Sequence, residues 1–256
     1  MKRLVVKVGS NVLTHENRKL NVTRMSALVD QIAWLRDRGH EVILVSSGAV
    51  ACGRQELRVG HELDSVEQRQ LFSALGQTKL IGLYYDLFRE YNIHVGQVLT
   101  MKENFEPGEQ YDNQRACMRV MLEHGVLPIV NENDTVSVTE LMFTDNDELS
   151  GLIAQMLEAD RLILLSNIDG IYDGHPDDPA SQLIPVVKLG EDLTSVIRTE
   201  KSAFGRGGMS SKYATATRVA AAGIEVVIAN GMRENILIDL MERSNETPHT
   251  TFLPCH

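Results

Sequence analysis

Short apolar segments alternate along the chain with longer segments in which apolar residues recur every three or four positions. The short segments are nearly continuous in Val, Ile and Leu, which is typical of strands covered on both faces. They predict six strands, at residues 4–8, 41–45, 94–99, 127–130, 161–165 and 225–229. The longer segments have the period of amphipathic helices and predict helices at residues 23–38, 65–91, 109–124, 147–157, 210–222 and 233–243.

This alternation favours an α/β fold: a single three-layer αβα domain around a mainly parallel central sheet. Neither a Pro/Ser-rich linker nor an internal repeat divides the chain, so we expect one domain over residues 1–256. In folds of this class, ligands bind beyond the carboxyl ends of the strands. The residues that follow each predicted strand are therefore the candidates for chemistry.

Lys7 interrupts the first predicted strand, and Gly9 and Ser10 follow it. A buried ammonium group requires an anion nearby, whereas a lysine on an edge strand extends to water. The second predicted strand continues into Ser47 and Gly48, where small residues at a helix start can expose backbone N–H groups to an anion. A simple helix cap accounts for the same residues. Each of these two signals, taken alone, leaves both interpretations open.

Two polar clusters occupy comparable places further along the chain. The string Asn131-Glu132-Asn133-Asp134 comes directly after the predicted strand 127–130. Its mixture of donors and acceptors can hold an ammonium group and orient a carboxylate, although turns also favour Asn and Asp. A second cluster, Asp145-Asn146-Asp147, opens a predicted helix. Acidic residues at a helix start interact favourably with the helix dipole. The dipole does not explain the asparagine between the two aspartates.

The segment 205–212 has the sequence GRGGMSSK and leads into a predicted helix. Its glycines expose backbone N–H groups, its serines can cap the helix, and Lys212 adds a positive charge, which together suit a polyphosphate. The spacing matches neither a Walker A loop nor a dinucleotide-binding fingerprint, and a flexible linker is the alternative. Ser166 and Asn167 follow another predicted strand, and Tyr172 lies close enough in sequence to face a nucleobase.

Composition narrows the class of protein. A formal net charge of −10 disfavours nucleic acid as a partner, and any anionic substrate then requires a local positive pocket. We expect no membrane association, because no stretch approaches the roughly 20 apolar residues of a membrane span. The three cysteines, Cys52, Cys117 and Cys255, lack C-x-x-C spacing, and one would remain unpaired in any disulfide scheme. Reduced thiols and a cytoplasmic location are therefore expected.

Together these motifs resemble the amino acid kinase family. The lysine-bearing first strand, the segment 46–50, the string 131–134, the cluster 145–147 and the segment 207–212 occur in the family's order and approximate spacing. The segments 74–77 and 94–97 look like the members that act on glutamate. The resemblance implies transfer of the γ-phosphate of ATP, with Mg²⁺, to the side-chain carboxylate of glutamate, which is the first step of proline biosynthesis. It also implies a short form without the C-terminal PUA domain that many such members carry.

The resemblance also implies roles for individual residues. Lys7 and Lys212 would flank the transferred phosphoryl group, and Asp147 would hold both side chains in position. The residues implied to bind glutamate, with Asp134 pairing with its α-ammonium group, are Ser47, Gly48, Asn131, Asp134 and Asn146. The residues implied to bind ATP are Lys7, Gly9, Ser166, Asn167, Arg206, Gly207, Gly208, Met209, Ser210, Ser211 and Lys212. No residue is implied as a ligand of a protein-bound metal, since the magnesium would arrive on ATP.

The expected division of labour places glutamate in the N-terminal part and ATP in the part from about residue 160. The chain departs from the family pattern at Asn167, where aspartate is frequent, and at Arg206, where threonine is usual. The resemblance further suggests a homo-oligomer, a dimer or tetramer, and feedback inhibition by proline. The alternatives are a family member that acts on acetylglutamate, aspartate, carbamate or a nucleoside monophosphate, and a non-catalytic sensor. The string 131–134 favours a free amino acid, because its carboxylates attract an α-ammonium group and repel a phosphate.

Overall fold

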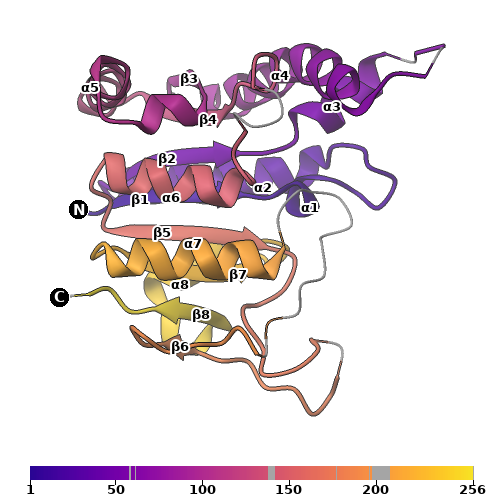
Figure 1. The fold of residues 1–256 in the computed structure, drawn as a ribbon. Helices are drawn as coiled ribbons and strands as arrows, with labels where there is room; N and C mark the ends of the chain where they lie inside the picture. Colours follow the sequence, from indigo (N-terminus) through magenta and orange to yellow (C-terminus); the bar gives the residue numbers. More distant parts are fainter. Residues whose placement is uncertain are drawn as a thin grey trace.

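A central sheet of mainly parallel strands forms the middle layer of the molecule (Figure 1). The structure, a computed structural model, describes residues 1–57, 59, 60, 62–137, 142–176, 178–195, 197 and 208–255. Within them the strands are β1 (Arg3–Val8), β2 (Glu41–Ser46), β3 (Val95–Thr100), β4 (Leu127–Glu132), β5 (Arg161–Ser166), β6 (Val186–Val187), β7 (Glu225–Asn230) and β8 (His249–Phe252). Their order across the sheet is β3-β4-β2-β1-β5-β7-β8-β6.

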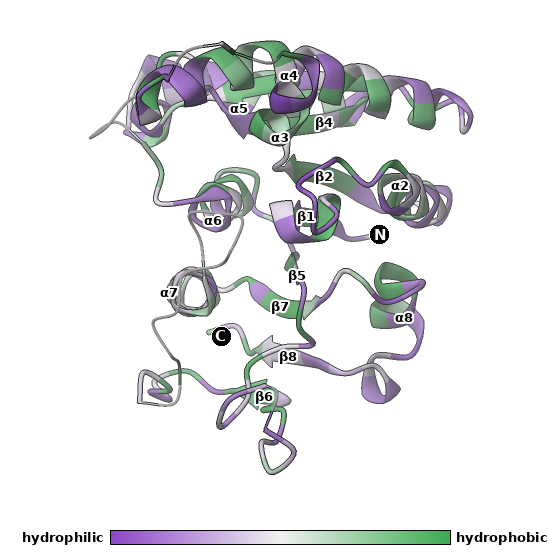
Figure 2. Cartoon of the chain, turned by 90° about the vertical axis from the view of Figure 1, so that its right-hand side faces the viewer, coloured by the Kyte–Doolittle hydropathy of each residue, from purple (hydrophilic) through white to green (hydrophobic). Residues whose placement is uncertain are grey.

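Helices cover both faces of this sheet. They are α1 (Ser10–Leu13), α2 (Val22–Asp37), α3 (Ala49–Glu56), α4 (Ser65–Arg89), α5 (Glu109–Glu123), α6 (Asn146–Met156), α7 (Met209–Ala221) and α8 (Ile236–Glu242). Figure 2 shows α6 and α7 on one side of the strands and α2 and α8 on the other. Two buried apolar clusters fill the space between the layers, one with residues of α2, α4 and α8 and the other with residues of α5, α6 and α7. The predicted three-layer α/β fold is confirmed.

All six predicted strands and all six predicted helices are present, with ends within three residues of those predicted. Two strands were not predicted, β6 and β8, and β8 runs antiparallel to β7. The prediction that residues 131–134 follow a strand was wrong for its first half, because β4 continues to Glu132, which pairs with Thr100 of β3. None of the described helices combines the length and apolar character that a membrane crossing requires.

Helices α3 and α4 pack with their backbones in contact. A Cβ atom added at Gly76 of α4 would overlap the carbonyl oxygen of Ala49, and one added at Gly53 of α3 would overlap that of Phe72. The two glycines therefore allow an approach that a side chain would block. This contact holds the start of α3 beside β2, where the candidate site lies.

We expect Gly76→Ala to destabilise the protein by about 3 kcal/mol, because α3 and α4 must separate to admit the methyl group. Gly82→Ala in the same helix is the matched control, since nothing lies within 4 Å of a Cβ atom there. That control should be neutral or stabilising by up to about 1 kcal/mol. Urea unfolding of both variants measures the difference, and equal midpoints would refute the packing argument.

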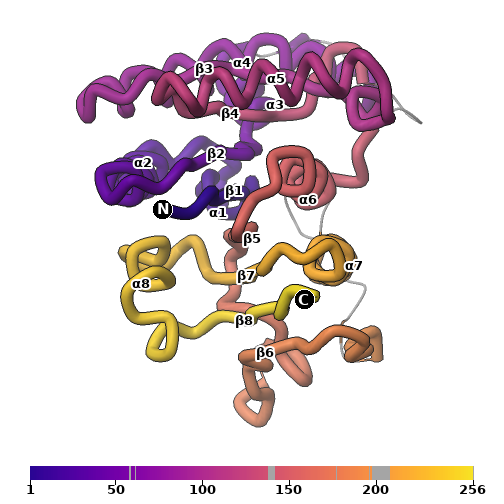
Figure 3. Tube along the Cα trace, turned by 90° about the vertical axis from the view of Figure 1, so that its left-hand side faces the viewer, coloured from indigo at the N-terminus to yellow at the C-terminus, as the bar shows by residue number. Residues whose placement is uncertain are grey.

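Strand β1 lies inside the sheet, with strands from the N-terminal half on one side of it and strands from the C-terminal half on the other. Figure 3 shows the N-terminal half of the chain building one side of the sheet and the C-terminal half building the other. Strand β1 pairs in parallel with β2 on one side and with β5 on the other. In open α/β sheets, the carboxyl ends of the strands at such a reversal of order form a crevice for ligands.

Candidate active site

A cleft of about 1600 Å³ opens at the carboxyl ends of the central strands. Pockets for one small ligand usually measure about 300–1,000 Å³, so this cleft has room for two. Gly9, Ser47 and Ser166 line it directly after, or at the end of, β1, β2 and β5. The first turns of α6 and α7 close it from one face of the sheet. The sequence predicted this convergence from the positions of these residues after successive strands.

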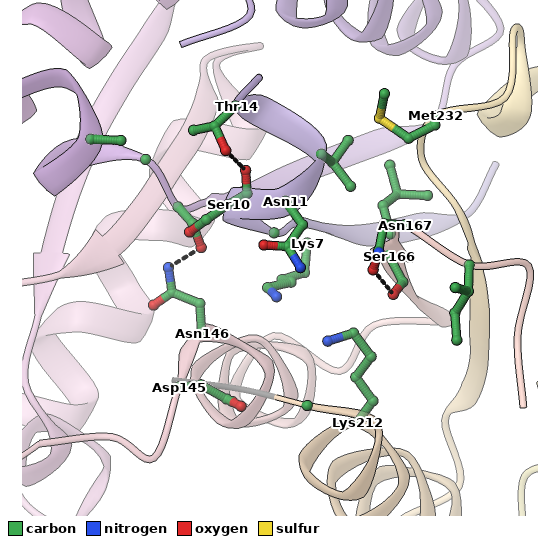
Figure 4. A pocket seen from close by; sticks show the side chains of 18 of the residues that line it. Lys7, Ser10, Asn11, Thr14, Asp145, Asn146, Ser166, Asn167, Lys212 and Met232 are labelled. Atoms are coloured by element: carbon green, nitrogen blue, oxygen red, sulfur yellow. Dashed lines mark hydrogen bonds between the residues drawn. The ribbon is translucent and has the colours of Figure 1, made fainter. Parts of the chain in front are cut away.

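Two lysines and one aspartate meet at the floor of the cleft. The Nζ atom of Lys7, on β1, lies 2.6 Å from Oδ1 of Asp147, and Nζ of Lys212, on α7, donates to Oδ2 of the same carboxylate at 2.9 Å. Asp147 is fully buried, and Lys7 and Lys212 are 5% and 8% exposed. Figure 4 shows both lysine side chains extending into the same pocket from different elements. One carboxylate thus holds two ammonium groups side by side, with a net positive charge.

Burial and the neighbouring charges shift the pKa values of Lys7 and Asp147. Burial lowers the pKa of Lys7, and the Lys212 charge lowers it further, while Asp147 opposes the shift. Burial by itself would raise the pKa of Asp147, but the ammonium groups of Lys7 and Lys212 outweigh it and hold this pKa below its ordinary value. The carboxylate is therefore ionised at neutral pH, as its role as a bridge between two cations requires.

Local backbone features fix the start of the two helices that border the cleft. Asp145 caps α6, since its Oδ1 accepts hydrogen bonds from the backbone N–H groups of Asp147 at 2.9 Å and Glu148 at 3.0 Å. This cap sets the rotation of the first turn, which carries Asn146 and Asp147. Gly48 precedes α3 with φ of 109°, a left-handed conformation that a side chain would strain. The turn between β2 and α3 therefore depends on glycine at this position.

The residues implied to bind glutamate lie together on the β2 and β4 side of the cleft. Asn146 Nδ2 donates to Ser47 Oγ at 2.9 Å and to Asn131 Oδ1 at 3.0 Å. Asn131 Nδ2 in turn donates to Gln77 Oε1 of α4 at 3.0 Å. Hydrogen bonds thus join four side chains in one row: Ser47 after β2, Asn146 at the start of α6, Asn131 on β4 and Gln77 on α4.

Asp134 lines the cleft but already has a cationic partner. Nε of Arg69, on α4, donates to its Oδ1 at 2.8 Å, and Nη2 of Arg69 donates to the carbonyl of Ser137 at 2.5 Å. A substrate ammonium group at this site would share the carboxylate with Arg69. Glu132 does not line the cleft, because its carboxylate is buried and accepts from Ser137 Oγ at 2.8 Å and from the backbone of Phe143 at 3.2 Å.

The residues implied to bind the substrates or to act on the phosphoryl group fall into four groups. Those that line the cleft are Lys7, Gly9, Ser47, Gly48, Asn131, Asp134, Asn146, Ser166, Asn167, Gly208, Met209 and Lys212. Ser210 and Ser211 lie on the first turn of α7 but do not line the cleft, and Ser210 is exposed. Asp147 lies beneath the surface of the cleft. Arg206 and Gly207 fall outside the described residues.

The sequence did not predict two side chains of α4 that hydrogen-bond to residues of the site. Arg69 lies in the second turn of α4 and Gln77 in its middle. Their partners in the site are 65 and 54 residues away in the chain. The helical pattern of residues 65–91 predicted only which side chains of that segment were apolar. The family resemblance included the segment 74–77, which contains Gln77, but neither the resemblance nor the helical pattern indicated that these two polar residues would reach the end of β4.

The part of the chain that the structure describes has no group of three or more His, Cys, Asp or Glu side chains placed to hold a metal ion. Both oxygens of Asp147 face the lysines. The described side chains therefore do not form a cage for a cation.

Comparison with known proteins places this geometry in a family. A sequence model of the Amino acid kinase family matches residues 2–230. The glutamate 5-kinase of Bacteroides thetaiotaomicron is 62% identical over 252 residues, covering 98% of this chain and 70% of the relative. The glutamate 5-kinase of Chlorobaculum tepidum is 46% identical over 237 residues, covering 92% of this chain and 65% of the relative. The chain thus spans about two thirds of the length of these curated relatives.

Solved structures with low sequence identity share the fold. A carbamate kinase from Giardia lamblia, bound to AMP-PNP, superposes with a TM-score of 0.71 at 16% identity and covers 99% of both chains. A UMP kinase from Bacillus anthracis gives a TM-score of 0.68 at 16% identity, with 100% of this chain and 97% of the other covered. At such identities the likeness concerns the fold alone.

Proposed function

Because the chain belongs to the amino acid kinase family, and within it to the glutamate 5-kinases, we propose that it transfers the γ-phosphate of ATP to the γ-carboxylate of L-glutamate. The product is L-glutamyl 5-phosphate, the first intermediate of proline biosynthesis. The observation that carries the proposal is the pair of ammonium groups, Lys7 and Lys212, held by one carboxylate in a cleft large enough for two substrates. Glutamate occupies the side lined by Ser47, Asn131 and Asn146, and ATP the side lined by Ser166 and Gly208.

The chemistry requires no nucleophile from the protein. The γ-carboxylate of glutamate is already ionised at neutral pH, and one of its oxygens attacks the γ-phosphorus in line with the bond to the β-phosphate. That P–O bond breaks, and its electron pair leaves with ADP. The obstacle is the approach of two anions, which Lys7 and Lys212 lower by neutralising charge on the phosphoryl oxygens. Asp147 positions both ammonium groups and does not itself contact the substrates.

The preference for a free amino acid is supported by the acidic and amide groups on the glutamate side. Asp134 and the amide oxygen of Asn146 are acceptors, which suit the α-ammonium group of glutamate. A phosphorylated acceptor such as a nucleoside monophosphate would bring negative charge to the same carboxylate. We therefore favour glutamate over the other acceptors used within the family.

A magnesium ion bound to the ATP phosphates would supply further neutralisation of charge. No residue of the chain is assigned to it, since the described side chains form no cage for a metal. The residues of the chain act on the phosphates through the ammonium groups and the backbone N–H groups at the start of α7.

An acceptor panel tests the proposed substrate. The purified chain is incubated with ATP, Mg²⁺ and hydroxylamine, which converts an acyl phosphate to a stable hydroxamate. The acceptors are L-glutamate, N-acetylglutamate, aspartate, carbamate and UMP, with ADP release measured in parallel. We expect γ-glutamyl hydroxamate with L-glutamate and little product from the others. Hydroxamate from N-acetylglutamate but not from glutamate would overturn the proposal, and tight ATP binding without ADP release for any acceptor would favour a sensor.

The rate should fall on the alkaline side because Lys7 must be protonated to act. Its pKa lies below the ordinary value of 10.5, so the charge is lost as the pH rises through that lowered pKa. At saturating glutamate, kcat/KM for ATP reports the protein that holds glutamate but not yet ATP. We expect this parameter to decline before pH 10.5 is reached. Lys7→Arg keeps its charge at such pH, so its remaining activity should lack this decline. A profile that is flat for both proteins would contradict the role of Lys7.

We also propose a cytoplasmic homo-oligomer subject to inhibition by proline. The three cysteines, Cys52, Cys117 and Cys255, are free, which suits a reducing compartment. Helix α4 exposes Leu75 and Tyr85, which supports a contact between copies. Sedimentation at the mass of two or four chains supports the assembly, and a monomer refutes it. Proline added to the acceptor panel tests the inhibition.

A further inference from the structure

Three side-chain amides connect the interior of helix α4 to the cleft. Gln77 Oε1 accepts from Asn131 Nδ2 at 3.0 Å, and Asn131 Oδ1 accepts from Asn146 Nδ2 at 3.0 Å. Asn146 Nδ2 also donates to Ser47 Oγ at 2.9 Å. Gln77 and Asn131 are 8% and 3% exposed. We call these three residues, Gln77, Asn131 and Asn146, the amide row.

The direction of the hydrogen bonds is the same along the whole amide row. Asn146 and Asn131 each donate from their nitrogen toward α4, and Asn131 and Gln77 each accept on their oxygen from the side of the cleft. Because the nitrogen of Asn146 is used by Asn131 and Ser47, its oxygen remains for a ligand. Within the described residues, Asn146 Oδ1 accepts no hydrogen bond, and Asn146 lines the cleft. An amide oxygen accepts from an ammonium group and repels a carboxylate.

We propose that Gln77 is a positioning residue for glutamate, which fixes the orientation of the Asn146 amide through Asn131 so that Asn146 Oδ1 meets the α-ammonium group. This inference rests on the proposed function. If the Gln77 end of the row offered its nitrogen instead, Asn131 and Asn146 would each turn over. Asn146 would then present an N–H group to the cleft and favour a carboxylate. The orientation of one buried amide outside the cleft thus determines which end of the amino acid Asn146 recognises.

The decisive variant is Gln77→Met, which keeps the length of the side chain and removes the acceptor. Asn131 then loses the partner that orients it, and Asn146 loses its fixed direction. We expect KM for glutamate to rise about tenfold, as for the loss of one charge-assisted hydrogen bond, with KM for ATP unchanged. Gln77→Glu retains an acceptor oxygen at the same place and cannot donate, so its KM for glutamate should stay within about threefold of the unchanged protein.

Glutarate, which is glutamate without the amino group, is tested as a competitive inhibitor. It distinguishes a loss of ammonium recognition from a general loss of order in the glutamate site. Its inhibition constant against glutamate should be the same in the unchanged protein and in Gln77→Met, because it has no ammonium group to lose. Gln31→Met is the structural control. Gln31 is also a buried helical glutamine, with its amide bonded to the backbone of Ala27 and Leu237 on the α2 and α8 side. That variant should lose stability and keep its KM for glutamate.

The unchanged protein is assayed first, so the two proposals can fail separately. Absence of γ-glutamyl hydroxamate from it refutes the proposed function. With an active protein, a normal KM for glutamate in Gln77→Met refutes the positioning role. Equal impairment of Gln77→Glu and Gln77→Met, or an equal rise in the inhibition constant of glutarate, refutes it as well. If Gln77→Met does not fold, Gln77→Leu replaces it with the same expected results.

Discussion

Lys212→Ala should lower kcat at least about a hundredfold, because one of the two ammonium groups that stabilise the transferred phosphoryl group is lost. Removal of one such group raises the barrier by about 3 kcal/mol. The fold should survive, since Asp147 keeps Lys7 as its partner at 2.6 Å and no charge is left unpaired. The measurement is kcat for γ-glutamyl hydroxamate at saturating substrates, with the unfolding midpoint determined on the same sample.

The matched control for this variant is Lys79→Ala. Lys79 is also an ion-paired lysine, but its partner is Glu56, both side chains are more than a third exposed, and it does not line the cleft. Its removal should leave kcat unchanged. Near-normal turnover of Lys212→Ala, or an equal loss in both variants, would show that Lys212 does not act on the phosphoryl group.

Asp147→Ala should cause the largest loss of stability, because it leaves two buried ammonium groups facing each other without a counterion. Breaking a buried pair from one side costs about 3–5 kcal/mol, and here two cations are affected. Both lysines lose their fixed positions, so turnover should also fall at least about a hundredfold. Asp239→Ala is the control: Asp239 pairs with Arg243, which is largely exposed, and such pairs contribute about 0–1 kcal/mol.

The pH dependence of this loss identifies its electrostatic cause. Without Asp147 the folded-state pKa of Lys7 falls further below the ordinary value of 10.5, which Lys7 has in the unfolded chain. Between these two values the unfolded chain binds more protons, so the stability of the variant rises with pH. The free energy of unfolding is measured in urea at pH 7 and pH 10. The variant should be less stable than the unchanged protein at both, and the difference should be smaller at pH 10. A deficit that does not change with pH would indicate a packing defect instead.

The strands at the centre of the parallel sheet, such as β1, β2 and β5, could be predicted because they are buried on both faces and consist largely of Val, Ile and Leu. Strand β8 could not, since its sequence His-Thr-Thr-Phe places two hydroxyls in the sheet. Thr250 is fully buried, and its hydroxyl donates to the carbonyl of Ile184 and accepts from the backbone of Ile171. Only the tertiary structure supplies these partners, so sequence patterning alone assigns the segment no preference.

The candidate site divides in the same way. Residues such as Lys7, Ser47 and Ser166 lie at or just beyond the carboxyl ends of parallel strands. Parallel strands end at one edge of a sheet, so the convergence of these residues followed from their positions in the sequence. Arg69 and Gln77 instead reach the site from positions within helix α4. Their contacts depend on the packing of α4 against the end of β4, which no local pattern encodes.

The central claim is that the γ-carboxylate of glutamate attacks the γ-phosphorus of ATP directly, and an isotope label tests it. Glutamate carrying ¹⁸O in both γ-carboxylate oxygens is incubated with ATP, the protein and hydroxylamine. Hydroxylamine attacks the acyl carbon of the product, so the bridging oxygen leaves with phosphate. We predict phosphate with one ¹⁸O atom for each γ-glutamyl hydroxamate formed. Phosphate without ¹⁸O would contradict direct attack by the carboxylate.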